Sequence, residues 1–356
     1  MDEIGESKTV DIVLPNLNKI DYIEECVESL LQQTYTNWRC LVIDGNSTDG
    51  SWEILQRYAS HDSRFELHQP GRLGLYPSWN YGLGQVQSSL FTFLTSDDVW
   101  HPDWLRAAVN ALDAYPEAAC AMARPVYVDE ATRVVETAEL ARLADRLVRP
   151  FASESTVAGY SVQRRDGAHH AAMVYGLGSV PVTMHAVVMR SSLATEHFAD
   201  DLGSIADREW SLKMGLAGDV LYLRDVEAYL RQYDAQATAV TQHNKRDQLA
   251  ESVRVILERN SDAVQEATGL SDTAFGAYRD RIQQLFDFLY ARPSFSMARS
   301  NPTAALRRFL QAFYFAPRLM LLELYGMLVN RTKYTTQERV QTTHEILEAM
   351  NSRGMR

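Results

Sequence analysis

The sequence predicts an α/β fold with a mostly parallel central sheet, followed by a helical C-terminal extension. Strand-like and helix-like patterns alternate through the first 130 residues, as in sheets whose parallel strands are joined by covering helices. From about residue 245 the pattern stays helical to the end of the chain. A chain of 356 residues can hold one large domain and an extension, and we predict a first domain over 1–240 and a helical region over 241–356.

The first elements pair a buried strand with an amphipathic helix. The apolar run at 9–15 (TVDIVLP) predicts a strand, and Asp21 with Glu24 predicts a capping box at the start of the next helix. The run at 38–44 (WRCLVID) predicts a second strand, after which Asp49 can cap a second helix. This order of elements is what a parallel sheet requires.

The same alternation continues as far as residue 130. It predicts, in order, a strand at 65–69, a helix at 78–87, a buried strand at 90–95 (LFTFLT), a helix that starts near Pro102, and a strand at 118–128. Each apolar run is bounded by polar or turn-forming residues, which sets its ends.

Residues 130–180 have a less regular pattern. We interpret them as an insertion or lid on the acceptor side, meaning the side of the site where a second substrate would bind. A helix is expected at 138–147, and His169 and His170 lie in the polar segment that follows. Beyond this region the patterns predict a strand at 181–190, a helix at 207–216 and a strand at 220–223.

Composition excludes several classes of protein. The formal net charge of -11 makes nucleic acid an unexpected partner. The three cysteines form no CxxC pair, which favours reduced thiols in the cytoplasm. The acidic N-terminus (MDEIGESK) lacks the features of a signal peptide, and no apolar run reaches the roughly 18 residues of a membrane-spanning helix. We therefore predict a cytoplasmic protein.

Polar residues gather where three of the predicted strands end, at 15–18, 44–49 and 96–98. Ligands of open α/β sheets bind at the carboxyl ends of the strands. Because three separate strand ends carry polar side chains, the sequence predicts one binding crevice at that edge of the sheet.

Asp97 and Asp98 are the sharpest feature of this crevice. Two adjacent carboxylates after a buried strand repel each other unless a cation compensates. Mg²⁺ or Mn²⁺ would suit them, because both ions prefer oxygen ligands and leave positions open for substrate phosphates. The alternative is a solvated cap for the helix near Pro102.

Two other acids are candidates for binding and catalysis. Asp44 ends the second strand, where it can accept hydrogen bonds from a base or a ribose, or from local backbone amides. Asp207 lies at a predicted helix start, where it can act as a general base or as an N-cap. Glu209 is the fallback base. Inverting displacement at a sugar carbon needs only one such base.

The chain resembles the family 2 glycosyltransferases, which are inverting enzymes with a GT-A fold. The resemblance is carried by five segments in order over residues 8–240: IVLPNLNKIDYIEECVESLLQQTYTNWRCLVIDGNSTDGS, GLYPSWNYGL, FLTSDDVWHPDWL, ADREWSLKMGLAGDVLYL and YLRQYDAQAT. It implies a GT-A-type nucleotide-binding domain that transfers a sugar from a nucleotide sugar.

The resemblance also implies roles for particular residues. It places Asp97 on a divalent metal, Asp207 as the catalytic base, and Arg231 near the donor diphosphate. The other donor-side positions are Pro15, Asn18, Asp44, Asn80, Ser96 and Asp98. Apart from the resemblance, Trp100 and His185 are candidates for contact with the acceptor, and the alternative for both is a packing role in the core.

This chain departs from the family pattern at four positions. Thr95 stands where the first carboxylate of the DxD motif is expected, and Gly45 follows Asp44 where a second aspartate is common. Ala206 replaces the usual Glu before the base, and Tyr233 replaces the histidine of the YRxH segment. We therefore expect altered metal affinity and an altered base, while Asp97 and Asp207 are retained.

The predicted function is a metal-dependent inverting glycosyltransferase that uses Mn²⁺ or Mg²⁺. We expect a nucleotide-sugar donor, with a UDP-sugar favoured, and a saccharide or lipid-linked saccharide acceptor in surface polysaccharide assembly. Two alternatives remain: a nucleotidyltransferase, which would normally carry a glycine-rich loop where this chain has PNLNKID, and a non-catalytic saccharide-binding relative.

The apolar residues of 304–329 are accompanied by Arg307, Arg308 and Arg318. Such a segment is expected to pack on the first domain or on another subunit of a homo-oligomer. The alternative is peripheral contact with the inner face of a membrane, where lipid-linked acceptors lie.

Overall fold

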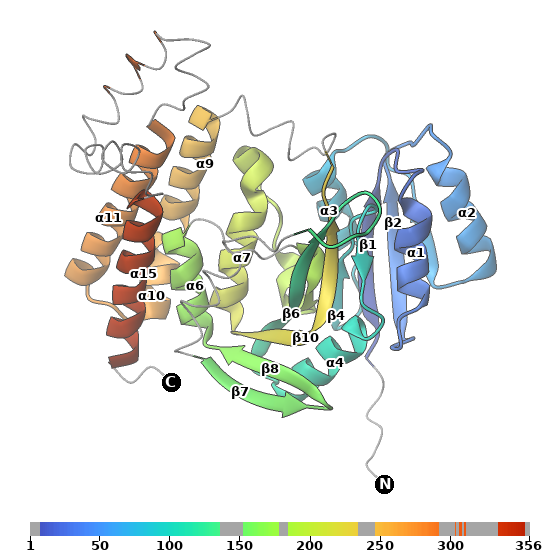
Figure 1. The fold of residues 1–356 in the computed structure, drawn as a ribbon, viewed down its shortest axis with the longest axis horizontal. Coiled ribbons are helices and arrows are strands. Elements are labelled where there is room, and N and C mark those ends of the chain that lie inside the picture. The colour runs from blue at the N-terminus through green and yellow to red at the C-terminus, as the bar shows by residue number, and fades with distance from the viewer. Residues whose placement is uncertain are drawn as a thin grey trace.

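A ten-stranded sheet forms the centre of the computed structural model, with helices on both faces (Figure 1). The structure describes residues 8–135, 152–177, 184–233, 246–291 and 334–352, together with residues 303, 306, 307 and 310. The strands are β1 (Val10–Asn16), β2 (Trp38–Asp44), β3 (Phe65–His68), β4 (Leu90–Phe93), β5 (Val99–Trp100), β6 (Ala118–Val128), β7 (Ala152–Val157), β8 (Tyr160–Arg165), β9 (Val187–Arg190) and β10 (Asp219–Arg231).

The helices lie between the strands and after the last of them. They are α1 (Ile23–Leu31), α2 (Ser51–His61), α3 (Leu75–Leu83), α4 (Trp104–Ala114), α6 (Gly167–Leu177), α7 (Ala206–Ala217), α9 (Arg246–Arg259), α10 (Ser261–Thr268), α11 (Asp272–Ala291) and α15 (Tyr334–Ser352). Three short 3₁₀ segments, η2 (Met184–Ala186), η3 (Ser191–Thr195) and η4 (Asp200–Ile205), flank β9 and precede α7.

The sheet is parallel in its first half and mixed in its second. The order is β3-β2-β1-β4-β9-β6-β10-β8-β7, and the first four of these strands run parallel. β9 is antiparallel to both its neighbours, while β6 and β10 are parallel to each other. The α/β prediction is therefore confirmed, but the sheet is less parallel than the alternation suggested, because β9 and the β7–β8 hairpin run the other way.

Two apolar cores cover the two faces of the sheet. One core packs α1, α2 and α4 against the sheet, through residues such as Val27, Leu55 and Trp104. The other contains α3, α6 and α7 and extends without a break into the helices after residue 245, through residues such as Tyr278 and Phe286. In Figure 1 these C-terminal helices stand against α6, at the opposite end of the molecule from α2. The predicted helical extension is thus packed on the sheet domain.

The region predicted as an insertion or lid contributes to the sheet and to the core. β7 and β8 form a hairpin at the sheet edge, with a tight turn whose two residues, Ala158 and Gly159, have positive φ. His169 and His170 both lie on the buried helix α6. Burial lowers the pKa of His170 to about 3, so this side chain is neutral. The helix expected at 138–147 lies outside the described residues, as does the boundary expected at 240.

Helix starts differ from the predicted caps. The N-cap of α1 is Tyr22, and its side chain makes no capping bond, so the capping box proposed for Asp21 and Glu24 is wrong. Instead the carbonyl oxygen of Lys19 accepts from the backbone N–H groups of Tyr22 and Ile23, which starts the helix. The N-cap of α2 is Gly50 rather than the predicted Asp49, which lies one residue earlier and accepts from the N–H of Ser51 at 3.0 Å.

Most of the apolar and arginine-rich segment at 304–329 lies outside the described residues. Within it, the structure describes Leu306, Arg307 and Leu310, and both leucines are exposed. Among the helices that the structure describes, none combines the length and the apolarity needed to cross a membrane.

Candidate functional site

The carboxyl ends of β1 and β2 hold a buried polar cluster around Asp44. Asp44 is fully buried and lies opposite Asn16 in the parallel pair. Its carboxylate accepts from Asn16 Nδ2 at 2.8 Å, from the Ser47 hydroxyl at 2.6 Å, and from Gln69 Nε2 at 3.0 Å. These bonds compensate for burial of the charge and hold Asp44 at the strand end where a nucleoside was predicted.

The loop after β1 is tied to the loop after β2. Asn18 adopts a left-handed conformation, with φ of 52°, and its side-chain oxygen accepts from the Thr48 N–H at 2.8 Å. The Asn18 N–H donates to the Ser47 hydroxyl at 3.0 Å. Pro15 lies buried just before this loop, opposite Ile43. Pro15, Asn18 and Asp44 are therefore brought together, as predicted for one side of the crevice.

Asp97 lies in the turn after β4 and carries a cationic partner that the sequence analysis did not identify. Lys19 Nζ lies 2.7 Å from Asp97 Oδ2, and the Tyr233 hydroxyl donates to the same oxygen at 2.7 Å. Burial raises the pKa of Asp97, but the Lys19 charge and the bonds from Lys19 and Tyr233 outweigh burial and lower it. Asp97 is therefore ionised over the whole physiological pH range.

Asp98 is more deeply held by the protein. Its Oδ1 accepts from the Arg231 backbone N–H at 2.8 Å, and its Oδ2 accepts from the Thr95 hydroxyl. His185 Nδ1 lies 3.5 Å from the same Oδ2. Burial raises the pKa of Asp98, and the neighbouring charge of Asp97 raises it further, although His185 opposes the shift. These contacts orient Asp98 toward the protein interior, so it braces the turn.

Arg231, predicted near the donor diphosphate, is buried and fully occupied by the protein. Its Nε donates to the Asp97 carbonyl at 2.9 Å, and its Nη2 forms an ion pair with Glu25 at 2.6 Å. Its Nη1 bonds to the backbone oxygens of Asp129 and Glu130 and to the Thr132 hydroxyl. The guanidinium therefore fixes the acidic turn, and contact with a diphosphate would require it to break these bonds.

The predicted base, Asp207, lies in the first turn of α7 and is half-buried. The Tyr76 hydroxyl, from α3, hydrogen bonds to its carboxylate. Burial raises the pKa of Asp207, and the Arg208 charge and the Tyr76 bond only partly offset this. A carboxylate whose pKa is raised is a better proton acceptor, which suits a general base.

An aromatic cluster joins Asp207 to the acidic turn. Phe93 ends β4, four residues before Asp97, and its ring contacts Trp210 of α7 at a centroid distance of 5.9 Å. Phe198 stacks on Trp210 at 4.8 Å and on Tyr76 at 5.2 Å. The last residue of β4 and the start of α7 are thus packed together, which places both acids at one edge of the sheet.

Asn80 has a structural role in this cluster. Its side-chain amide donates to the Phe198 carbonyl at 2.9 Å and accepts from the Phe198 N–H at 2.8 Å. Both polar groups of the amide are therefore used to hold the segment before α7, so the donor-binding role predicted for Asn80 would require these bonds to open.

Glu209, the fallback base, is almost fully buried, with 1% of its side chain exposed. Arg259 Nη1 lies 3.2 Å from each of its oxygens, and Asn260 Nδ2 donates to Oε1 at 3.0 Å. Because both oxygens are held by the C-terminal helices, Glu209 positions α7 and leaves Asp207 as the accessible acid.

The residues predicted to touch an acceptor are enclosed. Trp100 is 2% exposed, and its indole N–H donates to the His185 carbonyl at 2.7 Å. His185 is 6% exposed, and its Nε2 has no hydrogen-bond partner among the described residues. Ser96 is also buried in the acidic turn. Neither ring face of an enclosed tryptophan can stack on a sugar. Trp100 therefore has a packing role beside the acidic turn.

The acidic turn fits a divalent cation that shares its ligands with a substrate. A carboxylate oxygen of Asp97, at the strand end, already binds a positively charged group, the Lys19 ammonium. Mg²⁺ and Mn²⁺ are commonly held by one or two carboxylates, and phosphates and water complete the shell. Within the part of the chain that the structure describes, no three His, Cys, Asp or Glu side chains are grouped to hold a metal. A cation at this turn would therefore rest mainly on Asp97 and on ligands from the substrate and water, and this role of Asp97 stays a prediction.

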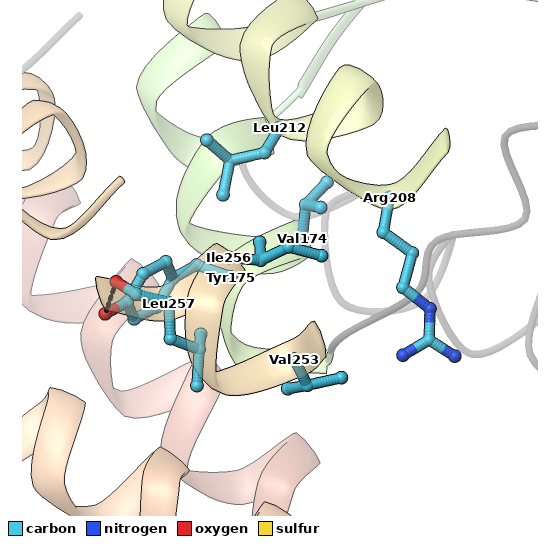
Figure 2. Close-up of a pocket in the computed structure, with 7 residues that line it drawn as sticks. All are labelled: Val174, Tyr175, Arg208, Leu212, Val253, Ile256 and Leu257. Atoms are coloured by element: carbon cyan, nitrogen blue, oxygen red, sulfur yellow. Dashed lines mark hydrogen bonds between the residues drawn. The ribbon is translucent and has the colours of Figure 1, made fainter. Parts of the chain in front are cut away.

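A small pocket lies between α6, α7 and α9 (Figure 2). Its walls are mostly apolar, with the Arg208 side chain at its edge. The lining residues are Val174, Tyr175, Arg208, Leu212, Val253, Ile256 and Leu257. No carboxylate or imidazole lines it, so it offers no acid–base chemistry and belongs to the packing of the C-terminal helices.

Three contacts to predicted site residues were missed from the sequence: Lys19 contacts Asp97, Tyr76 contacts Asp207, and Glu25 contacts Arg231. A single lysine, tyrosine or glutamate in an otherwise ordinary segment has no spacing signal, because each reaches its partner through the folding of distant strands. All three residues lie inside segments that carry the family resemblance, and this was the available hint.

Comparison with known proteins finds similarity to glycosyltransferases in the first half of the chain. Residues 11–171 match the profile of glycosyl transferase family 2. The chain is 34% identical over 113 residues to TuaG of Bacillus subtilis (strain 168), covering 32% of this chain and 44% of TuaG. It is 35% identical over 94 residues to glycosyltransferase GlyG of Streptococcus pneumoniae, covering 26% of this chain and 31% of GlyG. The chain therefore matches less than half the length of these relatives.

Solved structures share the fold over almost the whole chain. Staphylococcus aureus TarS 1–349 in complex with UDP-GlcNAc superposes with a TM-score of 0.58 at 18% identity, covering 97% of this chain and 92% of TarS 1–349. The mannosyltransferase PcManGT from Pyrobaculum calidifontis, in complex with GDP-Man and Mn²⁺, gives 0.52 at 16% identity, covering 98% and 88%. This likeness confirms the predicted fold class.

Proposed function

Because residues 11–171 match the profile of glycosyl transferase family 2, we propose that the chain transfers a sugar from a nucleotide sugar to an acceptor hydroxyl. The observation that carries this proposal is the gathering of Asp44, Asp97 and Asp207 at one edge of the sheet, each in a different chemical setting. Asp44 has its charge satisfied by neutral donors, Asp97 by a cation, and Asp207 only in part.

The proposed reaction inverts the anomeric carbon in a single displacement. Asp207 accepts the proton of the acceptor hydroxyl as the oxygen attacks, and its raised pKa strengthens it as a base. The bond from the anomeric carbon to the diphosphate breaks, and the nucleoside diphosphate leaves. No covalent sugar intermediate is needed, so a single carboxylate suffices.

Asp44 and the loop that carries Asn18 hold the nucleoside, and Asp97 holds the cation at the diphosphate. A bound Mg²⁺ or Mn²⁺ would neutralise charge that builds on the leaving diphosphate. Arg231 and Asp98 position Asp97 through the bonds described above. A base and a ribose bound on this side of the crevice would favour a nucleotide over a free sugar phosphate.

A UDP-sugar is the favoured donor, and a saccharide or lipid-linked saccharide is the favoured acceptor. The TarS structures in complex with UDP-GlcNAc and UDP support the first choice. The name of TuaG, which refers to teichuronic acid biosynthesis, supports surface polysaccharide assembly. With a lipid-linked acceptor, the protein would work at the inner face of a membrane.

Turnover of a panel of UDP- and GDP-sugars tests the proposal. Nucleoside diphosphate release is measured with Mn²⁺, with Mg²⁺ and with chelator, for the unmodified protein, Asp97→Ala and Asp207→Asn. Asp262→Asn, at an exposed position on α10, serves as the control. We expect both site variants to lose turnover and the control to keep it. Undiminished turnover in both site variants would refute the assignment, and pyrophosphate release would indicate a nucleotidyltransferase instead.

A further inference from the structure

We infer that Lys19 is a donor-binding residue that leaves Asp97 when a divalent cation arrives and moves to the donor diphosphate, so that cation and nucleotide bind together. This inference rests on the proposed function and names a partner for the diphosphate that the family resemblance did not supply.

The backbone of Lys19 is fixed by hydrogen bonds, whereas its side chain is partly exposed to solvent. Its carbonyl oxygen starts α1 by accepting from the N–H groups of Tyr22 and Ile23, and the preceding residue, Asn18, is pinned to the loop after β2. The Lys19 side chain is 26% exposed, against 11% for Asp97. The ammonium therefore lies on the solvent side of the carboxylate, at the end of a flexible four-carbon stem.

The Lys19 ammonium and the Tyr233 hydroxyl share a single oxygen of Asp97. Both groups contact Oδ2 at 2.7 Å, and they also bond to each other. The ammonium lies 4.9 Å from the centre of the Tyr233 ring, where a cation interacts favourably with the ring face. Asp97 thus has one charged and one neutral partner on one of the two oxygens that a metal could use.

A divalent cation on Asp97 is incompatible with the ammonium in this position. Metal–oxygen bonds to a carboxylate are about 2 Å long, so the cation and the ammonium together would place three positive charges around one carboxylate. Like charges at that distance repel strongly, so Lys19 must leave. Tyr233 is under no such pressure, because its hydroxyl contacts Asp97 as an uncharged hydrogen-bond donor.

A diphosphate on the same cation provides Lys19 with a new anionic partner. Its oxygens would lie beside the cation and carry more negative charge than the single carboxylate that Lys19 gives up. Loss of the Lys19–Asp97 pair is then compensated only when the nucleotide is present. Cation affinity and nucleotide affinity must rise together, by the same factor in each direction.

The test measures binding rather than turnover. Mn²⁺ binding is followed by the loss of free-ion electron paramagnetic resonance, and UDP and GDP binding by calorimetry, each with and without the other ligand. In Lys19→Met we expect Mn²⁺ alone to bind about tenfold more tightly, as loss of one charged hydrogen bond of roughly 1.5 kcal/mol implies. We expect nucleotide binding in the presence of Mn²⁺ to weaken by about the same factor.

Two variants keep this result interpretable. Lys213→Met removes a lysine of similar exposure, 23%, that also forms a 2.7 Å ion pair, with Glu196, and it should leave both affinities unchanged. Lys19→Arg keeps the charge and should keep the coupling between Mn²⁺ and nucleotide. Thermal unfolding of each variant verifies that it is folded.

Failure of the inference can be separated from failure of the proposed function. If the unmodified protein turns over a nucleotide sugar but Lys19→Met shows unchanged Mn²⁺ and nucleotide affinities, the role of Lys19 is wrong and the function stands. If the unmodified protein binds nucleotide and Mn²⁺ cooperatively without transferring any sugar, the role stands and the function is wrong. If it binds neither UDP nor GDP with Mn²⁺, both are wrong.

Discussion

The turn after β4 and the first turn of α7 each present two acids close together in sequence, but the protein treats the two pairs differently. In the turn after β4, Asp97 faces the crevice with a cation and Asp98 is held by the protein. In α7, Asp207 faces the crevice and is hydrogen bonded by the neutral hydroxyl of Tyr76. The buried Glu209 instead forms an ion pair with Arg259.

This difference shifts the pKa of the two outward-facing acids in opposite directions. That of Asp97 is lowered, because Lys19 and its hydrogen bonds outweigh burial, and that of Asp207 is raised, because burial outweighs its partners. A permanently ionised acid suits the binding of a cation, and an acid of raised pKa suits proton transfer. The comparison therefore assigns binding to one region and chemistry to the other.

The largest expected effect separates these assignments directly. Asp207→Asn removes the proton acceptor and should lower kcat by roughly 10²–10⁴-fold, with little change in nucleotide affinity. Asp97→Asn should instead abolish Mn²⁺-dependent nucleotide binding. The measurements are steady-state kinetics and calorimetry with UDP or GDP. If Asp207→Asn lost nucleotide affinity while Asp97→Asn kept it, the assignments would have to be exchanged.

The second prediction concerns the ion pair between Glu209 and Arg259, which holds α7 against the C-terminal helices. Arg259→Ala leaves the buried Glu209 carboxylate without its charged partner, so we expect a loss of about 3 kcal/mol in the free energy of unfolding. Arg254→Ala, on the same helix, removes an ion pair with Glu251 in which both side chains are exposed, and it should cost less than about 1 kcal/mol. Urea denaturation measures both. Equal losses would mean that Glu209 does not depend on Arg259.

A pH profile tests the environment of Asp207. As a base it must be ionised, so kcat should fall as the pH drops through its raised pKa. The Tyr76 hydroxyl bond lowers that pKa, so Tyr76→Phe should raise it further and move the acidic limb of the profile to higher pH. Tyr81→Phe, on the same helix, is the matched control and should not move the limb. A shift to lower pH in Tyr76→Phe would contradict the hydrogen bond.

Much of the fold and the acidic centres of the site could be predicted from the sequence, because they depend on local patterns. The strand predicted at 38–44 matches β2, and that at 118–128 matches β6, since each is a continuous apolar run with a polar boundary. Asp44 and Asp97 follow such runs, so their position at strand ends followed from the pattern alone.

What could not be predicted depends on contacts between distant segments. Arg231 looks like a phosphate ligand in sequence, and its burial comes from Glu25 on α1 and the backbone near 130. The antiparallel direction of β9 is set by its neighbours β4 and β6, because its own residues would suit either direction. Helix α3 begins at Leu75, three residues before the predicted start, because Gly74 rather than Ser78 precedes its first turn.

The smallest expected effect concerns the helices that support the α7 region. Gly276 lies in α11, where a Cβ would meet no atom within 4 Å, so Gly276→Ala should stabilise the protein by about 0.5–1 kcal/mol through helix propensity. At Gly176 in α6 a Cβ would lie 2.2 Å from the Thr343 hydroxyl of α15 and 2.5 Å from the Tyr278 hydroxyl of α11. Gly176→Ala should therefore destabilise by about 1–3 kcal/mol. Thermal unfolding measures both, and stabilisation by both substitutions would show that α15 and α11 do not pack on α6 as described.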